Sequence, residues 1–192
     1  MFPGIFKLNI EKIYTSFPEG KIDQVEMTIG GKGKTELLKD LEDRAKLDNS
    51  EEKIYISSHA RSMINNPEFV AVEKPELVDL VRLKASDLGF SRARTFNDIY
   101  MKAAELGLEL CPPEVGPQLR LNYDQVFKRE QPKGEWFYIG MKPVSDSDGD
   151  PRVFRLDRYR DGERWLGDRW AVPVDPWGPE GGLCFRSRKL ET

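Results

Sequence analysis

The sequence predicts an α+β fold, formed as a single domain by all 192 residues. Two patterns support this fold class. Several runs after residue 118 space their apolar side chains as β-strands do, and a capped amphipathic helix pattern precedes them at residues 95–107. The composition agrees, because 39% of the residues are hydrophobic and the 30 basic and 33 acidic side chains leave a net charge of only −3. This balance is typical of a globular protein with a highly charged surface.

The first 30 residues predict two short strands. Residues 6–10 and 25–29 alternate apolar with polar side chains, as strands with one buried face do. The turn-forming residues 17–20 lie between them, which allows a hairpin with a long connection. The sequence leaves open whether these strands join a larger sheet.

Two helices are expected next in the N-terminal part. Over residues 35–46, Leu37 and Leu41 fall on one helical face, with an acidic residue in the first turn and basic residues in the last. A shorter helix is expected over residues 58–65. It must end before Pro67, because the residue that precedes a proline is pushed out of the helical region.

The middle of the chain predicts two further helices. Pro75 can open the first, and the apolar spacing of residues 77, 80 and 81 favours a helix, although residues 78–80 also fit a buried strand. The second has Thr95 as its N-cap and Gly107 as its stop signal. The three prolines of residues 111–117 then predict an extended crossover and no helix.

The last third of the chain predicts an antiparallel meander with the Thr95 helix packed on one side. Asp161 and Gly162 form the pair that two-residue hairpins favour. The expected strands are residues 119–123, 135–142, 152–159, 164–170 and 183–188.

The chain is expected to be one domain, with a possible N-terminal subdomain at residues 1–66 and a core at residues 67–192. No apolar stretch approaches the roughly 18 residues of a membrane span, and no secretory signal is recognised. Cys111 and Cys184 are widely separated in apolar surroundings, which favours a reduced, cytoplasmic location. No membrane partner is expected.

Specific runs of sequence lie between residues 77 and 189. The longest are 87-DLGF-90, 98-DIY-100, 104-AELGLELCP-112, 114-EVGPQLRL-121, 134-GEW-136 and 145-SDSDG-149. In these runs the chain resembles a family of small uncharacterised bacterial proteins. The resemblance covers more than half of the chain and implies no particular activity, cofactor or site residue.

Two motifs imitate ligand-binding loops. Gly33, Lys34 and Thr35 fit the end of a phosphate-binding loop, but Thr28 stands where that loop needs its first glycine. A basic turn at Gly30–Thr35 that opens an ordinary helix is therefore favoured over nucleotide binding. Residues 146–150 imitate the start of a calcium loop, but Pro151 replaces the required glycine, so a solvated turn is favoured.

Few residues of the sequence match the known patterns of catalytic and metal-binding sites. His59 is the only histidine and is interpreted as an exposed helical residue, and two isolated cysteines make no zinc site. No cofactor is predicted. The alternative is a carboxylate-dependent hydrolase, because Glu109, Glu114 and Asp124 lie near the proline-rich crossover, where they could line a cleft.

The C-terminal hairpins concentrate arginine and aromatic residues, which are common anchors of protein interfaces. We therefore predict a non-enzymatic binding or protein-interaction module. A nucleic-acid-binding face is a further alternative, which the interspersed acidic residues disfavour. The predicted binding surface consists of Arg155, Arg158, Tyr159, Arg160, Trp165, Arg169 and Trp170.

Overall fold

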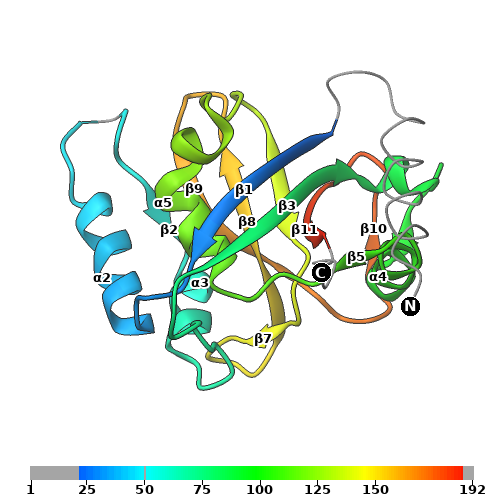
Figure 1. Ribbon diagram of the computed structural model, residues 1–192, viewed down its shortest axis with the longest axis horizontal. Coiled ribbons are helices and arrows are strands. Elements are labelled where there is room, and N and C mark those ends of the chain that lie inside the picture. Colours follow the sequence, from blue (N-terminus) through cyan, green and yellow to red (C-terminus); the bar gives the residue numbers. More distant parts are fainter. Residues whose placement is uncertain (1–21, 50, 188–192) are drawn as a thin grey trace.

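The computed structural model describes residues 22–49 and 51–187 of the chain, and a large mixed β-sheet organises them (Figure 1). The strand order is β1-β3-β11-β6-β8-β9-β2, with β5 paired to β11 and β7 paired to β8. The strands are β1 (Asp23–Ile29), β2 (Tyr55–Ile56), β3 (Glu76–Lys84), β4 (Arg94–Thr95), β5 (Leu108–Glu109), β6 (Trp136–Ile139), β7 (Val144–Ser145), β8 (Pro151–Arg158), β9 (Arg164–Trp170), β10 (Pro176–Trp177) and β11 (Gly182–Ser187).

Helices cover the sheet at its two ends. They are α2 (Lys34–Ala45), α3 (Ser58–Asn65), α4 (Phe96–Glu105) and α5 (Val115–Phe127), together with the short 3-10 helix η1 (Ala85–Leu88). Figure 1 shows α2, α3 and α5 gathered at the end that holds β2 and β9, and α4 at the opposite end beside β5 and β10. The described helices that pack on β8 and β9 are α3 and α5.

The α+β class is confirmed, and so are the elements with strong local signals. Helices α2, α3 and α4 lie where capping and periodicity predicted them. The Thr95 hydroxyl accepts a hydrogen bond from the Asp98 N–H at 3.1 Å, as an N-cap should. The expected strand at residues 25–29 is part of β1 and joins the main sheet, whereas the expected strand at residues 6–10 lies outside the described residues.

The helix expected after Pro75 is wrong, because these residues form strand β3. β3 lies inside the sheet, between β1 and β11, and buried side chains point to both of its faces: Val78 and Leu80 to one, Val81 and Leu83 to the other. Adjacent residues Leu80 and Val81 are both fully buried. A strand buried on both faces has a continuous apolar run, which periodicity alone does not separate from a helix.

The crossover at residues 111–117 and the strand at 119–123 are also wrong, because helix α5 runs through both. Pro117 lies in the first turn, where its missing N–H leaves no helical hydrogen bond unmade. Leu119 and Tyr123, four residues apart, are buried on one face. A Cβ at Gly116 would lie 2.7 Å from the Phe154 Cβ, so glycine lets α5 approach β8 closely.

The meander prediction holds for β6, β8 and β9, which pair antiparallel. The last strand departs from it, because β11 inserts between β3 and β6 and runs parallel to β6. The helix on the hairpin also differs from the expected one, since α5 packs there and α4 packs near β4, β5 and η1. Strands from the N-terminal part, β1 and β2, therefore complete the sheet that the C-terminal part builds.

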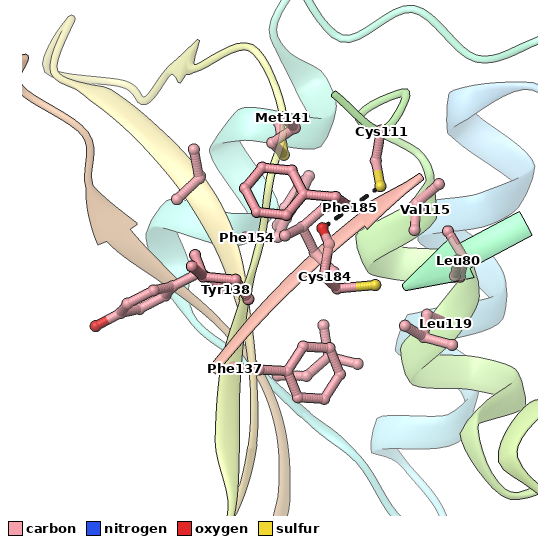
Figure 2. Packing of buried hydrophobic residues seen from close by; sticks show 14 of the residues in the cluster. Leu80, Cys111, Val115, Leu119, Phe137, Tyr138, Met141, Phe154, Cys184 and Phe185 are labelled. Atoms are coloured by element: carbon pink, nitrogen blue, oxygen red, sulfur yellow. Dashed lines mark hydrogen bonds between the residues drawn. The ribbon is translucent and has the colours of Figure 1, made fainter. Parts of the chain in front are cut away.

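The core lies on both sides of β6 and β11 (Figure 2). Phe137 faces α5, and Tyr138 points to the other side of the strand, where its ring lies 4.5 Å from that of Trp177. The Cys111 thiol donates to the Cys184 carbonyl at 3.5 Å, and both thiols are free and buried. Burial raises the pKa of the Cys111 thiol well above its usual value, which makes this thiol a poor nucleophile.

A buried carboxylate joins α5 to the N-terminal part. Glu114, at the start of α5, is 0% exposed. Its carboxylate accepts hydrogen bonds from the Gly30 N–H at 3.0 Å, the Val72 N–H at 2.5 Å and the Gln118 amide at 2.5 Å. Gly30 has a φ of +82°, and a Cβ there would lie 2.4 Å from the Lys74 carbonyl oxygen, so the turn requires glycine.

We expect Glu114→Ala to lower the free energy of unfolding by about 2–4 kcal/mol, because each buried donor left without an acceptor costs about 1–3 kcal/mol. Chemical denaturation measures this loss. The matched control is Glu105→Ala, which removes a carboxylate that is 65% exposed and should cost less than about 1 kcal/mol. Equal losses in the two variants would contradict the role of Glu114.

Candidate functional site

The seven residues of the predicted binding surface divide between the two faces of the β8–β9 hairpin. Residues directly opposite each other share a face, and Phe154, which contacts α5 at Gly116, marks the helix side. Arg158 and Trp170 belong to the helix side, and Arg155, Trp165 and Arg169 belong to the other. Tyr159 and Arg160 follow β8 in the turn and are exposed.

The face opposite α5, here called the open face, has two aromatic side chains on either side of an acid. Asp157 on β8 is paired with Trp136 of β6 and with Trp165 of β9, so the three residues form a row across three strands. The next row holds Tyr138, Arg155 and Gly167. Gly167 has no side chain, and an added Cβ would lie 3.4 Å from the Asp157 carboxylate.

An ion pair occupies the centre of the open face. The Arg155 guanidinium lies 2.5 Å from the Asp157 carboxylate, 4.8 Å from the Trp136 ring centroid and 5.9 Å from that of Tyr138. Trp165 stacks on Tyr55 at 5.0 Å. The face therefore presents planar aromatic and guanidinium groups without a local excess of charge.

The remaining arginines of the hairpin are also paired with acids. Arg158 donates to Glu130 at 2.8 Å and to the Gln131 carbonyl at 2.6 Å. Arg169 lies 3.0 Å from Asp175. The interpretation of these charges as ion pairs on wet faces thus agrees with the contacts, and few guanidinium groups remain available for phosphates.

An exposed apolar segment follows β9. Trp170, Val172 and Val174 are 49%, 37% and 77% exposed. The Arg169–Asp175 ion pair closes this segment at both ends. Three large apolar side chains exposed within five residues are more than scattered surface residues, and such patches mark sites of contact with other molecules.

A second group of polar residues lies on the helix side beside Trp170. Arg152 pairs with Asp146 and, at 2.7 Å, with Asp168. Asp168 also accepts the Ser57 hydroxyl at 2.6 Å and lies 3.6 Å from the His59 Nδ1 atom. The sequence predicts His59 as an exposed helical residue, and nothing local in the sequence indicates that Asp168 lies beside it.

This group does not form a convincing metal centre. His59, Asp146 and Asp148 are the only described residues that place three ligand atoms within 4.8 Å of one another. One Asp146 oxygen already accepts the N–H groups of Asp148 and Asp150, and the other pairs with Arg152. Asp146 thus closes the turn that the sequence predicted.

The carboxylates of the hydrolase alternative have separate partners. Glu109 pairs with Arg186 at 3.1 Å, Glu114 is enclosed beneath the Gly30 turn, and Asp124 lies 3.4 Å from Arg164. Glu114 and Asp124 are ten residues apart along α5, which is about 15 Å of helix. No shared cleft joins these two acids.

The loop that imitates a phosphate-binding loop uses its N–H groups internally. Gly30 donates to Glu114, and Gly31 donates to the Val72 carbonyl at 3.1 Å. The Lys34 ammonium group lies 3.3 Å from the Asn65 carbonyl oxygen. These contacts favour the predicted structural turn, because a phosphate site needs several such donors to be free.

Comparison with known proteins returned no matching family model, curated protein or solved structure. Among residues 22–49 and 51–187, no helix combines the length and the apolar character needed to cross a membrane.

The pKa of Asp157 gives a pH-dependent prediction. Burial raises this pKa above its usual value of 3.8, although Arg155 opposes the shift. The folded protein thus holds the proton more tightly than the unfolded chain, and it loses stability as the pH rises from 3.8 through the folded pKa. Relative to the wild type, Asp157→Asn should gain stability across this window, measured by urea unfolding at several pH values.

Asp146 provides the control of opposite sign. Burial opposes its ionisation, but the Arg152 guanidinium and two backbone N–H groups outweigh burial and lower its pKa. The stability from this group is present above pH 3.8 and is lost as the pH falls through the lower folded pKa. Relative to the wild type, Asp146→Asn should lose stability as the pH rises; the same slope in both variants would refute the assignments.

Proposed function

We propose that the protein is a non-enzymatic interaction module that binds a partner protein through its C-terminal hairpin. The proposed contact residues are those of the apolar segment (Trp170, Val172 and Val174) and, on the side of the hairpin opposite to Trp170, those of the open face (Trp136, Arg155, Trp165 and Arg169). The observation that carries the proposal is the exposure of this apolar segment, with Val174 at 77% and Trp170 at 49%. Exposed apolar patches with polar edges are typical of protein interfaces.

The composition of the surface supports a protein partner. Tryptophan, tyrosine and arginine are the residue types that most often dominate the energy of protein–protein contacts. On the open face, Trp136 and Trp165 stand on either side of the Arg155–Asp157 ion pair. The partner can thus bury planar groups, because the acid already balances the charge of the arginine.

The charge balance disfavours a polyanion as the partner. Arg155 and Arg169 on the open face are each paired with an acid, and Arg158 on the helix side pairs with Glu130. Phosphate groups would have to break these pairs before they gained a cation. Binding to nucleic acids draws its affinity mainly from such cations.

Trp170→Ala should weaken binding to the partner by about 30-fold, since truncation of a central interface tryptophan costs about 2 kcal/mol or more. Val174→Asp should have a similar effect because it places a charge in the apolar segment. The partner is captured by cross-linking in extracts of the source cells, purified, and titrated by calorimetry.

Val70→Asp is the matched control, because Val70 is 67% exposed but lies between α3 and β3. The control should bind as the wild type does. Loss of binding in all three variants, or in none, would refute this surface. A second copy of this chain could bind the surface instead of a different protein, and sedimentation of the purified protein tests this. A dimer that Val174→Asp disrupts would identify the second copy as the partner.

Fluorescence anisotropy with labelled single-stranded oligonucleotides should show no binding even at low salt, where electrostatic attraction is strongest. The wild type and the double variant Arg155→Ala/Arg158→Ala should give the same flat titration. Salt-sensitive binding by the wild type that the double variant loses would favour the nucleic-acid alternative instead.

A further inference from the structure

A small cavity lies where α5 meets the N-terminal part, away from the open face of the hairpin. Its volume is about 100 Å³, and its lining includes three arginines: Arg44 from α2, Arg120 from α5 and Arg164 from β9. The lining also includes Ile54 and Asp124. Water occupies roughly 30 Å³ per molecule in the liquid, so this volume suits a group the size of about three waters.

Arg120 is a buried cation without an acidic partner. Arg120 is 3% exposed, and its guanidinium forms no ion pair with any carboxylate in the described part of the chain. One terminal nitrogen donates to the Gln131 amide oxygen at 2.7 Å and to the Asp157 carbonyl at 3.4 Å. The Nε atom is buried and has no hydrogen-bond partner.

The surroundings of Arg120 make this charge costly. Burial, together with the positive charge of Arg164, lowers its pKa to about 10. A buried charge without a counterion normally costs several kcal/mol, so proteins rarely keep one without a role.

The cavity region has more cations than its acids can balance. Arg44, Arg120 and Arg164 line the cavity, and Asp124 is the acid among the lining residues. Arg164 lies 3.4 Å from Asp124 and 3.1 Å from Glu130, which is outside the lining. Two of the arginines also use neutral acceptors, since Arg44 donates to the Glu52 carbonyl and Arg164 to the Glu51 carbonyl. Asp157 does not correct the balance, because its carboxylate lies on the open face and pairs with Arg155.

The buried acid at the start of α5, in contrast, has all its hydrogen-bond partners within the protein. Glu114 is fully buried and has three hydrogen-bond donors around its carboxylate. Arg120, six residues later, has two neutral acceptors and one unused buried N–H group. Other arginines of the protein also have an unpaired buried Nε, but Arg155, Arg158 and Arg169 each pair with a carboxylate among the described residues, which Arg120 does not.

We propose that this cavity binds a single phosphate group, with Arg120, Arg164 and Arg44 as its ligands. Guanidinium groups recognise phosphate oxygens through paired N–H donors, and the two unbalanced positive charges match the dianion better than they match a carboxylate. The volume suits one phosphate group, and a larger group attached to that phosphate would extend out of the cavity.

The test is calorimetric titration of the full chain with inorganic phosphate near neutral pH, with sodium chloride holding the ionic strength constant. We expect saturable binding and a rise in melting temperature that equivalent chloride does not produce. Acetate should bind at least tenfold more weakly, as an approximate consequence of its smaller charge. Glycerol phosphate tests whether the natural ligand is free phosphate or a phosphate ester. Tighter binding of the ester than of the free ion identifies a phosphorylated small molecule.

Two variants and a control complete the test. Arg120→Met should abolish phosphate binding, and Arg44→Ala, which changes a less buried side chain, should weaken it by about tenfold or more. Arg92→Ala, at an exposed position outside the cavity lining, removes the same charge and should bind as the wild type does. If Arg120→Met does not fold, Arg44→Ala decides.

Three results would overturn the phosphate site: stabilisation by phosphate no greater than by chloride, acetate binding as tight as phosphate binding, or an equal loss of affinity in Arg44→Ala and Arg92→Ala. The outcome is independent of the proposed protein partner, because that test uses Trp170 and Val174 on a different surface.

Discussion

The position of α5 depends on the Glu114 carboxylate, and the arrangement of the sheet depends on α5. Glu114 holds the turn after β1 and the chain before β3 through backbone N–H groups. The following residues of the helix then reach β8, where Gly116 contacts Phe154. The acid thus links two distant backbone segments to a helix start whose Val115 is also fully buried, and its three donors satisfy a carboxylate that could not otherwise be buried.

This placement of α5 also decides which side of the hairpin is available. Residues of β8 and β9 that face α5 and α3 become buried or paired, as Phe154 and Asp168 do. The alternate residues lie on the other face, where Arg155 and Trp165 stay partly exposed, while Trp177 and α4 cover Tyr138 of β6. The open face is therefore a consequence of helix packing, and its neutrality follows from the i, i+2 spacing of Arg155 and Asp157, which places both on one side of β8.

Local signals in the sequence predicted part of the fold. Capping and apolar spacing located α2, α3 and α4, because these features act within a few residues. The predictions for β3 and α5 are wrong, because their identity depends on neighbours from elsewhere in the chain: β1 and β11 pair with the two edges of β3, and Phe154 explains Gly116 in α5. The site shows the same limit. The aromatic and arginine content was visible, but its division between two faces requires the strand register.

The cavity and the open face are electrically linked through β8. Arg120 donates to the Asp157 carbonyl from the cavity side, and its positive charge lowers the pKa of the Asp157 carboxyl, opposing the larger effect of burial. An anion in the cavity would offset that charge and leave burial with less opposition, so the pKa of Asp157 would rise. Because Asp157 lies between Trp136 and Trp165, its protonation would release Arg155 from its ion pair. Occupancy of the cavity would thus raise the pH below which the Arg155–Asp157 ion pair breaks, without movement of the sheet.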